Sequence, residues 1–431
     1  MTTAEENSLW PSVLKRLRLD WRAVLTTHLF FTGLGIVVFA PLISLLGRLL
    51  LSFSDQPALA DQDIARFLLS PVGIIGLIVV AALLIAILAF EQAAMMALGA
   101  ARLQGLYPGT LGALRLTGAR AGTITAFALR LVVRVLILTL PFLTAAAAVA
   151  WFLLTDYDIN YYLTERPSAF WLAAAAIGLL LIPMLLLLAS RLLAWSMSLS
   201  LVLFADLDAK YAFAESARFV AGHRRELIRA LLVWGVLALL LGAVVVAVVQ
   251  RLGAWVVPQF FDSIAWLVPV LGAFVILWML GNFIATAFTN SSLAYMLASF
   301  YDKHATGELR AVLNQDSRQH PARGPSVSAP ALATLLAGAA VAAVLVGGWL
   351  LNGIQIRDQA TVVAHRGAAG KAPENTLASI RQAIADGADW VEIDVQESAD
   401  GEVVVIHDSD FMKLARIDLK VWNGTLAELK A

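Results

Sequence analysis

Long runs of apolar residues, separated by short polar segments, dominate the chain from its N-terminus to about residue 351. A helix needs about 20 mostly apolar residues to cross the hydrocarbon core of a bilayer, and seven stretches reach that length. They run over approximately residues 24–53, 69–98, 131–154, 170–191, 227–249, 266–287 and 332–351. We therefore expect an α-helical membrane protein with about seven transmembrane helices.

The hydrophobic pattern changes abruptly near residue 353, where charged residues become frequent and apolar runs become short. The polar stretch before the last apolar run contains several Pro, Gly, Ser and Arg residues, which is typical of a linker. The predicted parts are a cytoplasmic N-terminal segment (1–23), a six-span membrane domain (24–300), a cytoplasmic linker (301–328), a seventh transmembrane helix (329–352) and an α/β segment (353–431).

The basic residues of the polar loops alternate along the chain. The N-terminal segment and the loops after the second, fourth and sixth spans carry sixteen Lys and Arg residues, whereas the opposite loops carry four. Basic loops stay on the cytoplasmic side. The pattern predicts a multi-pass protein of the cell (plasma or inner) membrane with a cytoplasmic N-terminus, and it places residues 353–431 outside the cytoplasm.

Composition supports this assignment and excludes other classes. Hydrophobic residues make up 60% of the 431 positions and charged residues 14%, against about 45–50% and about 25% in soluble domains. The absence of cysteine excludes a disulfide scaffold and thiolate chemistry. The formal net charge of zero argues against a nucleic-acid partner, and the apolar spans predict contact with membrane lipids.

Four charged residues in or next to the predicted spans are candidates for a function: Glu91, Arg130, Arg134 and Arg191. Each falls near the predicted cytoplasmic end of its span, where a long side chain can reach the headgroups. Two interpretations stay open. The charges either snorkel or form structural ion pairs, which is the favoured reading, or they line a transport path.

The α/β segment alternates short β-branched runs with one helical stretch. We expect strands over 361–364, 390–395 and 403–406, and a helix that opens at 373–376 and ends at Gly387. His365 and His407 each follow a strand, and in β/α folds reactive groups gather at the carboxyl ends of parallel strands. Glu392 and Asp394 lie two apart on one strand, so both side chains should point to the same face.

These residue types can together support phosphate chemistry. Paired carboxylates suit a divalent cation, Mg²⁺ or Ca²⁺, two imidazoles can act as a general acid and base, and Arg366 can hold a phosphate. Taken singly, each feature is more often structural: a strand-end histidine is usually surface or hydrogen-bonded, and a Glu-x-Asp pair is usually solvated. The conjunction of all of them, in order, favours a site.

Residues 363–430 resemble the start of the glycerophosphodiester phosphodiesterase family, in particular its bacterial subgroup with an N-terminal multi-span membrane domain. The matching stretches are Ala364-His365-Arg366-Gly367, Ala372-Pro373-Glu374-Asn375-Thr376-Leu377, Gly387-Ala388-Asp389, Glu392-Ile393-Asp394-Val395, Asp400-Gly401, His407-Asp408 and Thr425-Leu426-Ala427-Glu428-Leu429.

The resemblance implies a TIM barrel and a metal-dependent hydrolysis of glycerophosphodiesters to glycerol 3-phosphate and an alcohol. By position in the motifs, His365 and His407 would be the acid–base pair. Glu392 and Asp394 would ligate the cation, and Arg366 would bind the substrate phosphate.

The length of the α/β segment departs from this family. A TIM barrel takes about 250 residues, so residues 353–431 would form an incomplete barrel. We therefore expect this chain to be a fragment and the 431-residue form to be inactive. The alternative hypothesis is a membrane transporter or scaffold whose phosphodiesterase-like domain is vestigial, because six spans exceed what an anchor requires.

Overall fold

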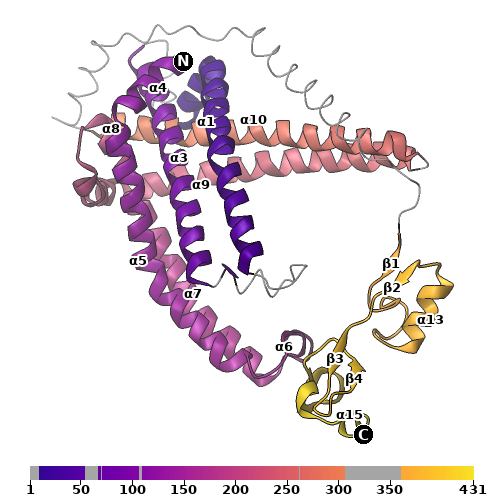
Figure 1. Cartoon of the computed structure of the whole chain (residues 1–431). Coiled ribbons are helices and arrows are strands. Elements are labelled where there is room, and N and C mark those ends of the chain that lie inside the picture. Colours follow the sequence, from indigo (N-terminus) through magenta and orange to yellow (C-terminus); the bar gives the residue numbers. More distant parts are fainter. Residues whose placement is uncertain (1–8, 54–66, 69, 106–108, 262, 306–360) are drawn as a thin grey trace. The chain divides into compact units, whose positions relative to one another are not determined.

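The computed structural model describes residues 9–53, 67–68, 70–105, 109–261, 263–305 and 361–431 (Figure 1). The chain divides into two compact units, which we describe separately. The first unit comprises Met1–Leu136 and Leu188–Ala342, and the second comprises Ile137–Leu187 and Ala343–Ala431. The seventh transmembrane helix predicted over 329–352 and nearly all of the linker predicted over 301–328 lie outside the described residues.

The described residues up to 305 are mainly helical. Their elements are α1 (Leu9–Phe53), α3 (Pro71–Leu103), α4 (Thr110–Ala119), α5 (Ala121–Leu154), α6 (Ile159–Glu165), α7 (Ser168–Trp195), α8 (Ser198–Phe204), α9 (Ala209–Val256), the short 3₁₀ turn η1 (Val257–Phe260) and α10 (Ile264–His304). Six helical stretches in the described part of the chain are long and apolar enough to cross a membrane. The short helices α4 and α8 were not expected from the sequence.

The long helices leave most of their apolar surface uncovered. Large side chains such as Leu179, Leu239 and Phe152 are more than 70% exposed. Leucine-rich surface of this extent is unfavourable in water and favourable in lipid. The exposed apolar faces are thus those expected of membrane helices.

The core of the first unit lies where α1, α3 and α10 pack together, with α9 alongside α10 (Figure 1). Small residues allow the helices to approach closely. Gly99 on α3 faces Tyr295 on α10, and a Cβ atom at position 99 would lie 3.2 Å from the tyrosine ring. Tyr295, Met95 and Met96 are among the largest fully buried side chains.

This core also encloses charged residues. Glu91 is 4% exposed, and its Oε1 lies 2.6 Å from Nδ1 of His28 and accepts a 3.2 Å hydrogen bond from Asn290. Asp20 pairs with Arg102 and accepts a hydrogen bond from the Tyr295 hydroxyl. For Glu91 the structure therefore agrees with the structural ion pair, whose partner His28 the sequence analysis did not identify.

The C-terminal part of the second unit contains short elements. They are β1 (Val363–Ala364), α13 (Leu377–Ala385), β2 (Trp390–Val391), β3 (Val395–Glu397), β4 (Val403–Val405), β5 (Asp410–Phe411), α14 (Met412–Ala415), β6 (Ile417–Lys420), η2 (Val421–Asn423) and α15 (Leu426–Leu429). The helix predicted after residue 376 is confirmed as α13, whose N-terminus is capped by Thr376.

Two expectations about the strands are wrong. The strand predicted over 390–395 is interrupted: β2 ends at Val391 and β3 begins at Val395, so Glu392 and Asp394 lie in the break. The strand before His407 pairs antiparallel with β3, whereas β1 and β2 pair in parallel. Because of this break, β2 can pair in parallel with β1 while β3 pairs antiparallel with β4. Three two-stranded sheets result among the described residues, and they do not establish a barrel.

Candidate active site

The turn after β1 brings His365 and Arg366 against the end of β2. The parallel register pairs Ala364 with Val391, which places the next residues of both strands side by side. The carboxylate of Glu392 accepts a hydrogen bond of 2.8 Å from the Arg366 backbone N–H, and its carbonyl accepts one of 3.2 Å from the Gly367 backbone N–H. Arg366 and Gly367 both adopt positive φ, 52° and 76°.

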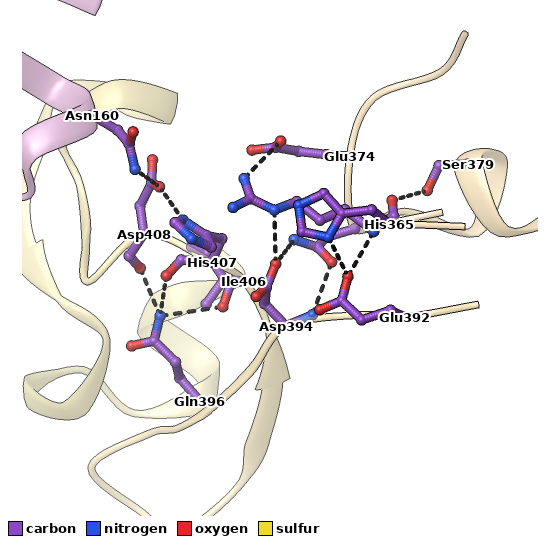
Figure 2. A network of polar contacts seen from close by, with 12 residues as sticks. Asn160, His365, Glu374, Ser379, Glu392, Asp394, Gln396, Ile406, His407 and Asp408 are labelled. Atoms are coloured by element: carbon purple, nitrogen blue, oxygen red, sulfur yellow. Dashed lines mark hydrogen bonds and ion pairs between the residues drawn. The ribbon is translucent and has the colours of Figure 1, made fainter. Parts of the chain in front are cut away.

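His365 pairs with Glu392. Nδ1 of the imidazole lies 3.0 Å from Oε2 of the carboxylate (Figure 2), and the histidine side chain is 73% exposed. A carboxylate at Nδ1 favours the tautomer in which Nδ1 carries the proton. Nε2 is then left to exchange a proton with a bound molecule.

The Arg366 guanidinium lies between two carboxylates. Its Nη1 donates to Glu374 Oε2 over 3.1 Å, and its Nε lies 3.2 Å from Asp394 Oδ2. Burial acts to raise the pKa of Glu374, but the hydrogen bond from Arg366 and the charge of Lys413 outweigh it and lower that pKa. The predicted phosphate-binding arginine is thus already paired, and phosphate would share it with Glu374 and Asp394.

Asn375 is a site residue that the sequence analysis quoted in a motif but did not assign a role. Its side chain donates to Asp394 Oδ2 over 2.9 Å and accepts from the Asp394 backbone N–H over 3.1 Å. Its backbone is left-handed, with φ of 57°, a conformation that asparagine tolerates better than most residues. Asn375 therefore holds both the backbone and the carboxylate of Asp394.

His407 follows β4 and forms a second imidazole–carboxylate pair. Its Nδ1 lies 2.8 Å from Oδ1 of Asp408, which is 4% exposed (Figure 2). The Gln396 side-chain amide lies 2.8–3.2 Å from the backbone carbonyls of residues 406–408 and donates to them. This amide holds the turn that carries His407. The sequence analysis had instead expected the carboxyl end of a parallel strand to position His407.

Asp408, which the sequence analysis quoted in a motif without a role, lies at the centre of a charged cluster. Burial acts to raise the pKa of its carboxyl, but hydrogen bonds from His407 and Asn160 and the nearby charge of Lys413 lower the pKa below its ordinary value. Lys413 Nζ lies 3.5 Å from Asp408 Oδ2 and 3.5 Å from Glu374 Oε1. Lys413 therefore links the His407 pair to the Arg366 cluster, and no sequence pattern singled it out.

The predicted site residues accordingly fall into two groups. His365, Arg366, Glu392 and Asp394 share direct contacts, while His407 joins them through Asp408, Lys413 and Glu374. An open pocket of about 480 Å³ borders His365 on the side of α13. Glu392, Asp394 and His407 do not line it.

The donor set is compatible with a hard cation. Glu392 Oε1 and Asp394 Oδ1 make no hydrogen bond or ion pair with any residue that the structure describes, so one oxygen of each carboxylate is available. Carboxylate oxygens are the ligands that Mg²⁺ and Ca²⁺ prefer. Among the described residues no group of three or more His, Asp or Glu side chains is close enough to hold a metal. Water or substrate oxygens would have to complete the coordination.

Six long apolar helices and a C-terminal α/β segment with two imidazole–carboxylate pairs define a membrane protein with a candidate acid–base site. A family model described as the membrane domain of glycerophosphoryl diester phosphodiesterase matches residues 10–323, and one described as the glycerophosphoryl diester phosphodiesterase family matches residues 365–431. The first match covers more than half of the chain, so the chain belongs to the family with this membrane domain.

The curated relatives match only a short part of the chain. Glycerophosphodiester phosphodiesterase 1 of Bos taurus is 55% identical over 53 residues, which are 12% of this chain and 16% of the bovine protein. Glycerophosphodiester phosphodiesterase of Caldanaerobacter subterraneus is 44% identical over 69 residues, 16% of this chain and 28% of that protein. The chain thus spans less than a third of these relatives' length. No solved structure matches.

Proposed function

We propose that the protein is a membrane-anchored phosphoric diester hydrolase that cleaves glycerophosphodiesters to glycerol 3-phosphate and an alcohol. One observation carries the proposal: two imidazoles, His365 and His407, each have a carboxylate at Nδ1, at 3.0 Å and 2.8 Å. Both belong to the segment matched by the phosphodiesterase family model.

Acid–base catalysis of phosphodiester cleavage needs two proton transfers. In the proposed reaction one imidazole Nε2 accepts a proton from the attacking water molecule as the new O–P bond forms. The other, protonated at the outset, donates its Nε2 proton to the alcohol oxygen as the old P–O bond breaks. Glu392 and Asp408 hold the rings in the required tautomer and stabilise their charged forms.

Glu392 and Asp394 would hold the divalent cation, Mg²⁺ or Ca²⁺, on which enzymes of this family typically depend. When bound, the cation would neutralise negative charge on the phosphodiester oxygens. Arg366 would bind the same phosphate, with Glu374 and Asp394 keeping its guanidinium in place. Asn375, which bonds both the backbone and the carboxylate of Asp394, would keep that carboxylate in place for this role.

We further infer that the catalytic segment lies outside the cytoplasm at the cell membrane, with the N-terminus inside. The distribution of basic loops supports this topology. A reporter that is active only outside the cytoplasm, fused after Gly353, should be active. A signal confined to cytoplasmic reporters would overturn the topology.

The short α/β segment led us to expect an inactive 431-residue form, but both imidazole–carboxylate pairs lie within it, so the proposal includes activity of this chain. It is tested with the full chain in detergent or vesicles, by measuring release of glycerol 3-phosphate from a soluble glycerophosphodiester. We expect release that a chelator abolishes and that added Mg²⁺ or Ca²⁺ restores. Replacing both His365 and His407 by Ala should lower kcat by at least about 10²-fold.

Glu397→Gln is the matched control, because Glu397 is exposed on β3 and makes none of the site contacts described above. This variant should retain wild-type rates. Folded wild-type protein that releases no glycerol 3-phosphate would overturn the proposed activity, and would favour a transport or scaffolding role for the membrane domain.

A further inference from the structure

The loop between two membrane helices contacts the segment that carries His407. We call residues 156–166, between α5 and α7, the docking segment, and residues 408–418 the acceptor segment. Both belong to the second compact unit. The docking segment contains α6 and is joined to α5 and α7 by only a few residues on each side, so it lies at the surface of the membrane.

Three contacts hold these segments together at their edges. The Arg416 Nη2 group lies 3.0 Å from Glu165 Oε2, and the Ser409 hydroxyl donates to Asp158 Oδ2 over 3.4 Å. The Tyr157 hydroxyl donates to Asp418, and burial together with this hydrogen bond raises the pKa of Tyr157. These contacts are one ion pair and two hydroxyl–carboxylate hydrogen bonds.

A buried carboxylate at the centre of the contact depends on the docking segment. Asp410 is 0% exposed. Its Oδ1 accepts from the Met412 backbone N–H over 3.0 Å, and its Oδ2 accepts from the Asp158 backbone N–H over 2.8 Å. A buried charge without partners is strongly unfavourable. Without the docking segment, Asp410 Oδ2 would lose its hydrogen-bond donor. The acceptor segment therefore needs the docking segment to cover Asp410.

Asn160 extends the contact to the candidate active site. Its side-chain amide donates to Asp408 Oδ1 over 3.1 Å (Figure 2), the same oxygen that pairs with His407 Nδ1 at 2.8 Å. Lys413 faces the other oxygen, Oδ2, at 3.5 Å. The carboxylate is therefore fixed from both sides, by Asn160 on α6 and by Lys413 on α14.

We propose that the docking segment of the membrane domain binds the acceptor segment, and that Asn160 is a positioning residue that orients His407 through Asp408. The contact holds the His407 turn at the membrane surface. The binding part stands on the contacts alone, whereas the positioning part rests on the proposed function. The two parts are therefore tested separately.

The binding part is tested by cross-linking. Because the chain has no native cysteine, only the introduced cysteines can react. Glu165→Cys and Arg416→Cys are combined in the full chain in lipid vesicles and treated with a short bis-maleimide. We expect an intramolecular cross-link between peptides containing positions 165 and 416. The control combines Glu165→Cys with Arg381→Cys on α13, since Arg381 makes no polar contact within the described part of the chain. Equal cross-linking of both pairs, or none at all, would overturn the binding part.

The positioning part is tested with Asn160→Ala and Asn160→Asp in the same vesicles. We expect kcat for a soluble glycerophosphodiester to fall about ten-fold, with KM changed by less than about two-fold, because the imidazole is misoriented while substrate binding is kept. Leu163→Ala, an exposed change on the same helix, should leave both constants unchanged. The 165–416 cross-link should survive Asn160→Ala, because the contacts of Asp158 with Ser409 and Asp410 remain.

Each result has a distinct meaning. Wild-type kcat in both Asn160 variants would overturn the positioning role. If the wild-type protein cleaves no diester while the Glu165→Cys, Arg416→Cys variant forms the cross-link, the proposed function is overturned and the docking contact stands.

Discussion

The side-chain amide of Asn375 connects its own loop to Asp394. It bonds both the backbone N–H and Oδ2 of Asp394, so Asp394 has little freedom to turn away. Partners of this kind, one step behind a metal ligand, govern how well the ligand is oriented. The motif Pro373-Glu374-Asn375-Thr376 contained the residue, but its role depends on a chain segment 19 positions away.

We expect Asn375→Gly to weaken cation binding about ten-fold. Glycine accepts the left-handed backbone of position 375, so the change removes both hydrogen bonds without adding strain. The measurement is the Ca²⁺ or Mg²⁺ concentration that restores half-maximal activity after chelation. Gly370→Ala in the same loop, where a Cβ atom meets nothing within 4 Å, is the control. An unchanged cation requirement in Asn375→Gly would contradict the role.

The buried carboxylate Asp408 should make stability depend on acid pH. Its pKa is lower in the folded protein than the ordinary value of about 3.9. The stabilising contribution of the carboxylate is therefore complete above that value and disappears as the pH falls through the lowered pKa. We expect the melting temperature of the full chain to fall more between about pH 5 and about pH 3 in the wild type than in Asp408→Asn.

Glu397→Gln, a change at an exposed carboxylate on β3, should keep the pH dependence of the wild type. Identical acid sensitivity of Asp408→Asn and the wild type would show that another group is responsible.

At the scale of elements, the turn after β1 is built against α13. Gly367 has φ of 76°, and a Cβ atom there would clash with the Ser379 hydroxyl and lie 2.8 Å from the Ser379 backbone carbon. Backbone atoms of a helix cannot move aside as a side chain can. The Ser379 hydroxyl also donates to the Arg366 carbonyl over 3.0 Å, so turn and helix position each other.

We expect Gly367→Ala to destabilise this part of the protein by about 2–3 kcal/mol, because it combines backbone strain with overpacking. Gly387→Ala separates the two effects, since Gly387 has φ of 81° but no neighbour near its Cβ position. It should cost about 1 kcal/mol. Protease resistance of residues 361–431 in the full chain measures both, and equal effects would rule out the contact with Ser379.

The hydrophobic pattern predicted the helix α13 correctly but not the strand over 390–395. A capped amphipathic helix such as α13 depends on local interactions, and its position was predictable from Thr376 and the apolar residues that follow. The run 390–395 looked like one strand because its apolar residues alternate. Strand pairing depends on distant partners, and Glu392 and Asp394 instead meet the Arg366 turn.

At the scale of the whole molecule, the membrane domain is held by polar contacts between helices far apart in sequence. Glu91 on α3 contacts His28 on α1 and Asn290 on α10. Hydrogen bonds between membrane helices are an important source of specificity, because lipid chains compete well for apolar side chains.

We expect His28→Ala and Glu91→Ala each to lower the free energy of unfolding by about 2 kcal/mol, because each leaves a buried polar group unpaired. The double variant should lose much less than the sum, since the two residues act as a pair. The melting temperature in detergent measures all three. Glu215→Ala, which breaks the exposed pair with Arg218, should change stability by less than about 0.5 kcal/mol. Additive losses would contradict the pairing of His28 with Glu91.

The sequence by itself determined the membrane class and most of the spans, and it proposed His365, Arg366, Glu392, Asp394 and His407 as site residues. Bilayer thickness sets the length of an apolar helix, and phosphate chemistry restricts which side chains can serve, so both leave local signals. Only the tertiary structure decided that β4 is antiparallel, that Arg366 is already paired, and that Asn160 and Lys413 meet Asp408. Those contacts join residues tens to hundreds of positions apart. Local hydrophobic periodicity carries no information about such partners, because they are chosen by how the whole chain packs.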